Sequence, residues 1–167
     1  MRLMQTILYA TDFSEHSCKA LDLGGSLARD HAARLVILHV VPSGAPVTGP
    51  GDGAALERAE RRQWDLQSYQ QEMAGRLRCL DVPAVAAPVE HLLEEGDPAT
   101  VIMRTAEQTS CDLIVLGTHG KTAEMRRLMG SVAEEVMRRA RCPVLTVKVP
   151  VAEPAGQPAP PKACVAL

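Results

Sequence analysis

The segment Asp112-Leu113-Ile114-Val115-Leu116-Gly117-Thr118-His119-Gly120 joins the clearest strand of the sequence to a polar loop that contains two glycines. Its apolar residues form a short unbroken run, as expected of a strand that is buried on both faces of a parallel sheet. The loop continues to Met129, and Gly130-Ser131 then opens a stretch whose apolar residues recur at helical spacing. The segment therefore predicts a strand, a loop and a helix in succession.

Four further strands are expected on either side of this segment. Residues 4–9 form a short apolar run, residues 34–41 form a continuous one that stops at a proline, and residues 142–148 form the last. Residues 82–93 also predict a strand, which Pro88 interrupts. Because a proline removes a donor from the hydrogen-bond ladder and is tolerated mainly at a sheet edge, this strand is predicted to be outermost.

Helices are expected between these strands. Ser14 can cap one helix, since a hydroxyl accepts a hydrogen bond from an orphan backbone N–H. Residues 56–80 are charged and helix-favouring, with apolar side chains for an inward face. Asp97-Pro98 opens another helix, because Asp is a favourable cap and Pro is preorganised for the first turn. With the helix after Gly130, the sequence predicts four helices.

Alternating strands and helices with right-handed crossovers specify an α/β fold. We expect a single domain with one open, parallel, five-stranded sheet in the order 3-2-1-4-5 and helices on both faces. The order reverses between the first strand, which ends near Ala10, and the fourth, which ends near Leu116. Ligands of such sheets bind at this point, outside the carboxyl ends of the strands.

The composition indicates one globular domain. The chain has 167 residues, of which 46% are hydrophobic and 23% charged, and this excludes a chain that is disordered throughout or fibrous. Residues 1–149 are expected to form the domain, with a mobile Gly/Pro-rich connection at residues 43–55. Residues 150–167 are rich in Pro and Ala and are expected to form a disordered tail.

Charge and aromatic content argue against nucleic acid and membranes as partners. The net charge is −2, and aromatic residues make up only 2% of the chain, too few to stack successive bases. No apolar run reaches the roughly 18 residues needed to cross a bilayer. The five cysteines are odd in number and scattered, which favours reduced thiols in the cytoplasm over a disulfide framework or a zinc site.

The loop after residue 116 has the outline of a phosphate-binding site. Gly117-Thr118-His119-Gly120 is followed, after nine residues, by Gly130-Ser131. Glycines let the backbone approach an oxyanion, and a helix N-terminus presents N–H groups and the positive end of a dipole. Residues 118–150 contain seven basic and three acidic side chains. In the alternative interpretation, Gly117 and Gly120 merely make a tight turn from strand to helix.

Two other phosphate motifs do not match. Gly120-Lys121-Thr122 imitates the end of a Walker A motif, but the first glycine of that motif would fall at Val115, inside the strand. The loop does not follow the G-x-G-x-x-G pattern of dinucleotide-binding folds either. Neither a P-loop nor a dinucleotide site is expected.

Over residues 3–149 the sequence resembles the universal stress protein family. The segments that carry the resemblance, in chain order, are residues 9–15 (YATDFSE), 38–40 (LHV), 96–98 (GDP), 116–122 (LGTHGKT), 130–134 (GSVAE) and 142–145 (CPVL). The resemblance implies an α/β fold of the adenine nucleotide alpha hydrolase-like type and a homodimer formed through the last strand, Val144 to Val147. The ATP-binding branch of the family carries G-2x-G-9x-G-(S/T), which Gly117, Gly120 and Gly130-Ser131 reproduce.

By position, the resemblance implies a site for ATP with Mg²⁺, without a catalytic residue or a metal ligand of its own. Asp12 would meet the ribose, and the residues around the adenosine would be Ala10, Thr11, Val40 and Leu116. The loop around the phosphates would consist of Gly117, Thr118, His119, Gly120, Lys121, Thr122 and Ala123, with Gly130, Ser131 and Val132 closing over them. Ala10 stands where many members have proline, which is expected to loosen the turn slightly.

Simpler roles remain open for single residues. Asp12 can cap a turn after the first strand, His39 is expected to be a satisfied core histidine, and His119 can either donate to a phosphate oxygen or point to solvent. For the whole protein, the main hypothesis is an ATP-binding universal stress protein with a regulatory or sensing role. The alternatives are a slow ATP hydrolase and a dimeric interaction module that ignores nucleotides.

Overall fold

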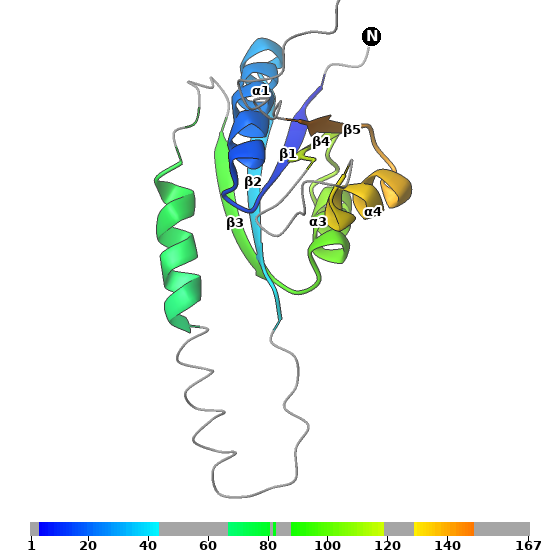
Figure 1. Ribbon diagram of the computed structural model, residues 1–167. Coiled ribbons are helices and arrows are strands. Elements are labelled where there is room, and N and C mark those ends of the chain that lie inside the picture. The colour runs from blue at the N-terminus through cyan, green and yellow to red at the C-terminus, as the bar shows by residue number, and fades with distance from the viewer. Residues whose placement is uncertain (1–3, 44–66, 81, 83–87, 119–128, 149–167) are drawn as a thin grey trace, which may run out of the picture.

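A computed structural model of the chain describes residues 4–43, 67–80, 82, 88–118 and 129–148. These residues contain one sheet of five parallel strands: β1 (Thr6–Thr11), β2 (Arg34–Val41), β3 (Val89–Glu95), β4 (Leu113–Gly117) and β5 (Val144–Val147) (Figure 1). Their order, β3-β2-β1-β4-β5, confirms the predicted arrangement.

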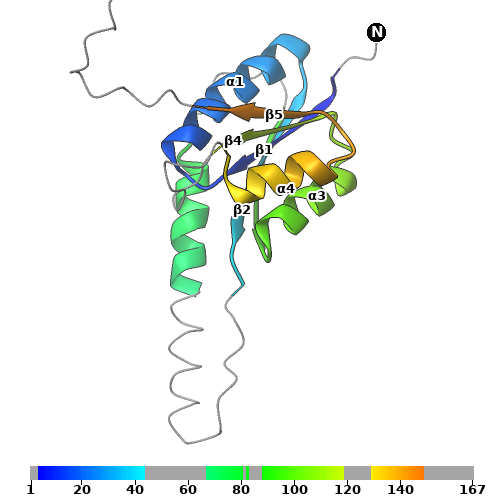
Figure 2. The same ribbon diagram turned by 45° about the vertical axis from the view of Figure 1, so that its right-hand side comes forward.

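Helices cover both faces of the sheet (Figure 2). α1 (Glu15–His31) and a helix through residues 67–78 pack on one face, and α3 (Pro98–Gln108) and α4 (Ser131–Arg139) pack on the other. The four predicted helices are therefore present, although only part of the one predicted at 56–80 falls within the described ranges. None of the helices in those ranges is long and apolar enough to cross a membrane.

The sheet separates two apolar cores, one on each face. Ile7 and Tyr9 of β1 pack with α1, whereas Leu8 and Ala10 pack with α3 and α4. This alternation follows from the two-residue period of a strand. Because both faces are covered, a central strand can be apolar at every position, which explains the unbroken runs in the sequence.

Side-chain caps fix where α1 and α3 begin. The Ser17 N–H donates to the Ser14 hydroxyl oxygen at 3.3 Å, and the Thr100 N–H donates to the Asp97 carboxylate at 2.9 Å. Pro98 follows directly as the first residue of α3. Both predicted helix starts are confirmed.

The third strand begins later than predicted. Instead of lying inside a strand over residues 82–93, Pro88 immediately precedes β3. It contributes its carbonyl oxygen, which accepts from the Leu35 N–H at 3.2 Å, so the N–H that proline lacks is not needed in the ladder. The prediction that this strand lies at an edge is confirmed for the described sheet.

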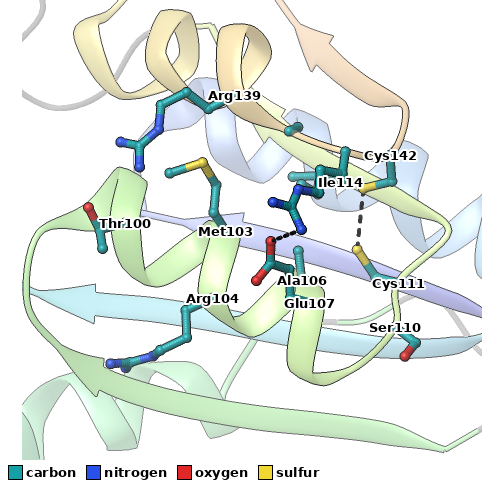
Figure 3. Close-up of a pocket in the computed structure, with 12 residues that line it drawn as sticks. Thr100, Met103, Arg104, Ala106, Glu107, Ser110, Cys111, Ile114, Arg139 and Cys142 are labelled. Atoms are coloured by element: carbon teal, nitrogen blue, oxygen red, sulfur yellow. Dashed lines mark hydrogen bonds and ion pairs between the residues drawn. The ribbon is translucent and has the colours of Figure 1, made fainter.

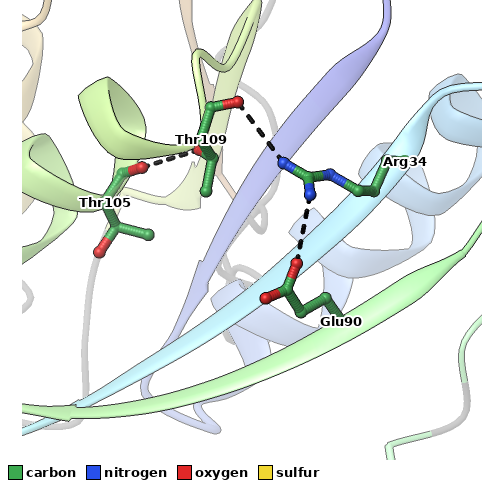
Figure 4. Close-up of polar contacts among 4 residues, drawn as sticks. All are labelled: Arg34, Glu90, Thr105 and Thr109. Atoms are coloured by element: carbon green, nitrogen blue, oxygen red, sulfur yellow. Dashed lines mark hydrogen bonds and ion pairs between the residues drawn. The ribbon is translucent and has the colours of Figure 1, made fainter.

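Polar contacts at the amino ends of the strands join β2, β3 and α3 (Figure 4). Arg34 lies 3.5 Å from a Glu90 carboxylate oxygen and donates to the Thr109 carbonyl oxygen, also at 3.5 Å. The Thr109 hydroxyl donates to the Thr105 carbonyl oxygen at 2.7 Å. An ion pair as exposed as Arg34 and Glu90 contributes at most about 1 kcal/mol, so these contacts chiefly fix the position of α3.

Candidate functional site

The carboxyl ends of β1 and β4 lie side by side in the middle of the sheet. Ala10 pairs in register with Leu116, so the chain leaves these two strands at neighbouring points. The strand order reverses between β1 and β4, which is where open α/β sheets hold their ligands. The fold thus brings together the two segments that the sequence analysis assigned to one site.

The N-terminus of α4 reaches the same edge of the sheet. The Gly130 N–H donates to the Thr118 carbonyl oxygen at 2.7 Å, and the Thr118 N–H donates to the Val147 carbonyl oxygen at 2.9 Å. Gly130 is the N-cap of α4, and within the described ranges no side chain caps this helix. Because the first N–H groups of a helix need partners from outside it, this end is suited to an anion.

An apolar base lies beneath this edge and draws on four elements. Ala10 and Leu116 are buried in the core on the α3 and α4 face, and Val40 and Val132 pack against the same cluster. These apolar residues are those that the sequence analysis assigned to the adenosine, together with Val132 from the group that it placed over the phosphates. Met129, which directly precedes Gly130, packs against the same cluster.

The turn after β1 contains Asp12, the residue predicted to contact the ribose. β1 extends to Thr11, one residue beyond its predicted end near Ala10. The Phe13 N–H donates to the Thr11 hydroxyl oxygen and the Ser14 N–H donates to Asp12 Oδ1, both at 3.0 Å. This confirms the turn-capping role of Asp12. A carboxylate accepts several hydrogen bonds, so the turn and a ligand hydroxyl are compatible partners for it.

His39 is a core residue, as expected, with 4% of its surface exposed. Its Nδ1 lies 2.7 Å from the Thr11 carbonyl oxygen, and because a carbonyl only accepts, Nδ1 donates. The ring packs against Phe13 at a centroid distance of 4.6 Å, and the Arg76 guanidinium lies 4.9 Å from the Phe13 centroid. The sequence did not predict this stack, because Arg76 comes from the helix through residues 67–78 and Phe13 adopts an unusual φ of 61°.

Tyr9 fixes the start of α1 behind the candidate site. Its hydroxyl donates to the Ser17 carbonyl oxygen at 2.7 Å, inside the core. Burial raises the pKa of Tyr9 to about 12, so the phenol stays protonated and keeps this hydrogen bond at neutral pH.

The two described glycines of the motif differ in their surroundings. A Cβ on Gly117 would lie 2.9 Å from backbone atoms of His16 and Ser17, so the close approach of α1 demands a glycine there. Gly130, at φ −74° and ψ 154°, has a backbone open to any residue. The structure thus gives Gly117 a packing role, which differs from the tight turn considered as the alternative, whereas the backbone of Gly130 gives no reason for a glycine.

The remaining predicted residues are Ser131, which the structure describes, and five loop residues, which it does not. Ser131 is the first residue of α4 and is exposed. The part of the predicted phosphate loop that lies outside the described residues consists of His119, Gly120, Lys121, Thr122 and Ala123. Within the described residues, no cluster of three or more His, Cys, Asp or Glu side chains is placed to hold a metal ion.

A cavity of about 590 Å³ lies elsewhere, between α3 and α4 (Figure 3). Residues of both helices line it, together with Ser110, Cys111, Arg141 and Cys142 near the entrances to β4 and β5. It contains none of the predicted site residues, so it is distinct from the candidate site at the carboxyl ends of β1 and β4.

Comparison with known proteins establishes the family. The model of the universal stress protein family matches residues 4–148. The chain belongs to the universal stress protein family. Universal stress protein MJ0531 of Methanocaldococcus jannaschii is 34% identical over 155 residues, which cover 90% of this chain and 86% of MJ0531.

Solved structures of universal stress proteins share the fold. The structure of MJ0577 from Methanocaldococcus jannaschii aligns with a TM-score of 0.72 at 28% identity, covering 90% of this chain and all of MJ0577. A universal stress protein in complex with cAMP aligns with a TM-score of 0.57 at 24% identity, covering 88% of this chain and 98% of that one. These alignments agree with the predicted fold type.

Proposed function

We propose that this universal stress protein binds ATP with Mg²⁺ at the carboxyl edge of β1 and β4, and that binding serves a regulatory or sensing role in the cytoplasm. The observation that carries the proposal is the contact between Gly130 and the Thr118 carbonyl. It sets the N-terminus of α4 beside the exits of both central strands. The positive end of the α4 dipole, which suits phosphates, then lies beside apolar residues, which suit the adenine.

The described residues offer a carboxylate that suits the ribose and apolar side chains that suit the adenosine. Asp12 offers carboxylate oxygens to the ribose hydroxyls, next to Thr11. Ala10, Val40 and Leu116 form the apolar base for the adenosine.

The phosphates would lie against the start of α4. Gly117, Thr118 and the loop residues His119, Gly120, Lys121, Thr122 and Ala123 would surround them on one side. Gly130, Ser131 and Val132 would close the other side. The cAMP complex of a protein with the same fold supports the choice of an adenine nucleotide.

Binding is favoured over rapid turnover, because neither of the candidate bases described near this edge is placed for attack on the γ-phosphate: one is assigned to the ribose and the other is a core residue. Asp12 accepts from the Ser14 N–H, and His39 is buried and donates to the Thr11 carbonyl. A slow ATP hydrolase remains the alternative, and phosphate release that depends on Ser131 or His119 would favour it.

We propose further that the protein is a homodimer formed through β5. β5 lies at the edge of the described sheet opposite β3, and all four of its residues are half-buried. An edge strand presents unpaired backbone groups to which a second copy can hydrogen-bond.

Calorimetric titration of ATP and Mg²⁺ into nucleotide-stripped protein tests the site, with Gly130→Val as the variant. The Gly130 backbone accepts valine, so the fold should persist while the side chain fills the position of the phosphates. We expect at least about a tenfold loss of affinity, equivalent to about 1.4 kcal/mol. Asp12→Asn, which keeps an acceptor for the Ser14 turn, should also weaken binding.

Gly75→Val is the matched control. Gly75 lies in the helix through residues 67–78, and a Cβ there would meet nothing within 4 Å. Its affinity for ATP should equal that of the wild type. Equal affinity of Gly130→Val and wild type would overturn the site assignment.

A further inference from the structure

Two thiols meet at one end of the cavity between α3 and α4 (Figure 3). The Sγ atoms of Cys111 and Cys142 are 3.6 Å apart, although the residues are 31 positions apart in the sequence. Cys111 is buried and Cys142 is half-buried, and both line the cavity. The sequence showed only scattered cysteines, and the fold turns two of them into a pair.

The backbone around both residues is held in place. Cys111 precedes β4 and Cys142 precedes β5, two adjacent parallel strands in which Ile114 pairs with Val144. The Cys111 N–H donates to the Ala106 carbonyl oxygen and the Ile114 N–H donates to the Pro143 carbonyl oxygen, both at 3.0 Å. The pair therefore rests on the sheet rather than on a chance rotation of two exposed side chains.

The distance between the two sulfurs permits a bond. The strands pair from Ile114 and Val144 onward, so both cysteines lie just before this ladder, where neighbouring strands are about 4.8 Å apart. The sulfurs are already 3.6 Å apart, and side-chain rotation has to bring them to the roughly 2.05 Å of a disulfide.

We propose that Cys111 and Cys142 form an intramolecular disulfide when the protein meets a peroxide. The sulfur of Cys142, the more exposed of the two, attacks one peroxide oxygen, the O–O bond breaks, and a sulfenic acid and one water result. The sulfur of Cys111 then attacks the Cys142 sulfur, the S–OH bond breaks, and the hydroxyl leaves as a second water with the Cys111 proton. Two thiols and one hydrogen peroxide thus give one disulfide and two waters.

The burial of the two thiols determines which of them reacts with the peroxide first. Burial, with a smaller contribution from Cys142, raises the pKa of the Cys111 thiol to about 12, so Cys111 is a poor first nucleophile at neutral pH. Cys111 acts only in the second step, for which its sulfur already lies 3.6 Å from the Cys142 sulfur. Cys18 and Cys79 are exposed and lie with α1 and the helix through residues 67–78, on the other face of the sheet, so they cannot replace either partner.

A structural zinc site is a poorer interpretation of the pair. Structural zinc takes four ligands, and the described residues hold no cluster of three or more metal-ligating side chains. The disulfide would instead join the two ends of the segment that contains β4 and α4. Closing this loop should raise the Tm of the oxidised protein by several degrees.

Peptide mapping of the full chain tests the proposal. The reduced protein is treated with hydrogen peroxide, denatured, alkylated with N-ethylmaleimide and digested with trypsin without reductant. We expect the peptides of residues 105–121 and 142–148 to be recovered cross-linked, two hydrogens lighter than their sum and separable by dithiothreitol.

Single substitutions provide the controls. Cys18→Ser should keep the cross-link and Cys142→Ser should abolish it, and circular dichroism verifies that both variants fold. Three results in the wild-type protein would overturn the proposal: alkylation of both cysteines after peroxide, Cys142 recovered as sulfinic acid beside alkylated Cys111, or bonds from the pair to other cysteines. None of these results bears on ATP binding, so the proposal stands apart from the proposed function.

Discussion

Gly117 and Gly130 belong to one predicted phosphate-binding motif, but only Gly117 is also required for packing. Both were predicted from the sequence as phosphate-binding glycines, but only the structure reveals that α1 passes so close to Gly117 that a Cβ would strike its backbone. Asp12 is similar, since the same carboxylate caps a turn and is suited to a ribose. Residue types and spacing predict such positions, whereas competing structural roles depend on contacts between distant elements.

Gly117→Ala should destabilise the fold. The added methyl group forces α1 to move or the strand end to shift, at a cost of about 1 to 3 kcal/mol in the free energy of unfolding. Urea denaturation measures this difference. Gly75→Ala, at an open helical position, should instead stabilise the protein by about 0.5 to 1 kcal/mol. If Gly117→Ala were as stable as the wild type, the packing role of this glycine would be wrong.

At the scale of elements, the helix starts were predictable and one strand boundary was not. Ser14 and Asp97 act through local hydrogen bonds to residues three positions later, so the sequence contains the information. The start of β3 depends on which backbone groups of Pro88 the neighbouring strand uses, and here that group is the carbonyl. At Pro88 the sequence correctly indicated an edge strand, but it did not show that the strand begins directly after the proline.

The cap of α3 should contribute to stability in a pH-dependent way. The hydrogen bond from Thr100 lowers the pKa of Asp97 below its usual value of 3.8. Its contribution is therefore fully present above the pKa of the unfolded chain and is lost as the pH falls through the lower folded pKa. Asp97→Ala should reduce the free energy of unfolding by about 1 kcal/mol at pH 7.

Denaturant unfolding at pH 7 and at about pH 2.5 measures this change. The difference between Asp97→Ala and wild type should shrink at the lower pH. Asp22→Ala, on an exposed position of α1, should change the free energy by less than about 0.5 kcal/mol at pH 7. A difference for Asp97→Ala that is equal at both pH values would contradict the role of the ionised cap.

For the whole molecule, the strand order could be predicted, because crossover handedness and an outermost third strand leave few topologies. The same rules predicted that the exits of β1 and β4 meet, as they do. The contact between Cys111 and Cys142 was not predictable in this way. It depends on the register between β4 and β5, which short apolar runs do not specify.

A single charged substitution on β5 tests dimerisation through this strand. Thr146 is the one polar residue of this strand and is half-buried, so Thr146→Lys should leave the monomer folded while opposing edge pairing. Light scattering after size-exclusion chromatography should give a dimer for the wild type and a monomer for the variant. Thr100→Lys, exposed on α3, should remain a dimer. A monomeric wild type, or a dimer that Thr146→Lys does not affect, would exclude this interface.

The most direct test of the central claim is the heat of binding when ATP with Mg²⁺ is titrated into the nucleotide-stripped protein and into Gly130→Val. The proposed site beside the start of α4 predicts saturable binding by the wild type and at least about a tenfold weaker affinity for the variant. Absence of binding by the wild type, or equal binding by both proteins, would contradict the assignment of this edge of the sheet to a nucleotide.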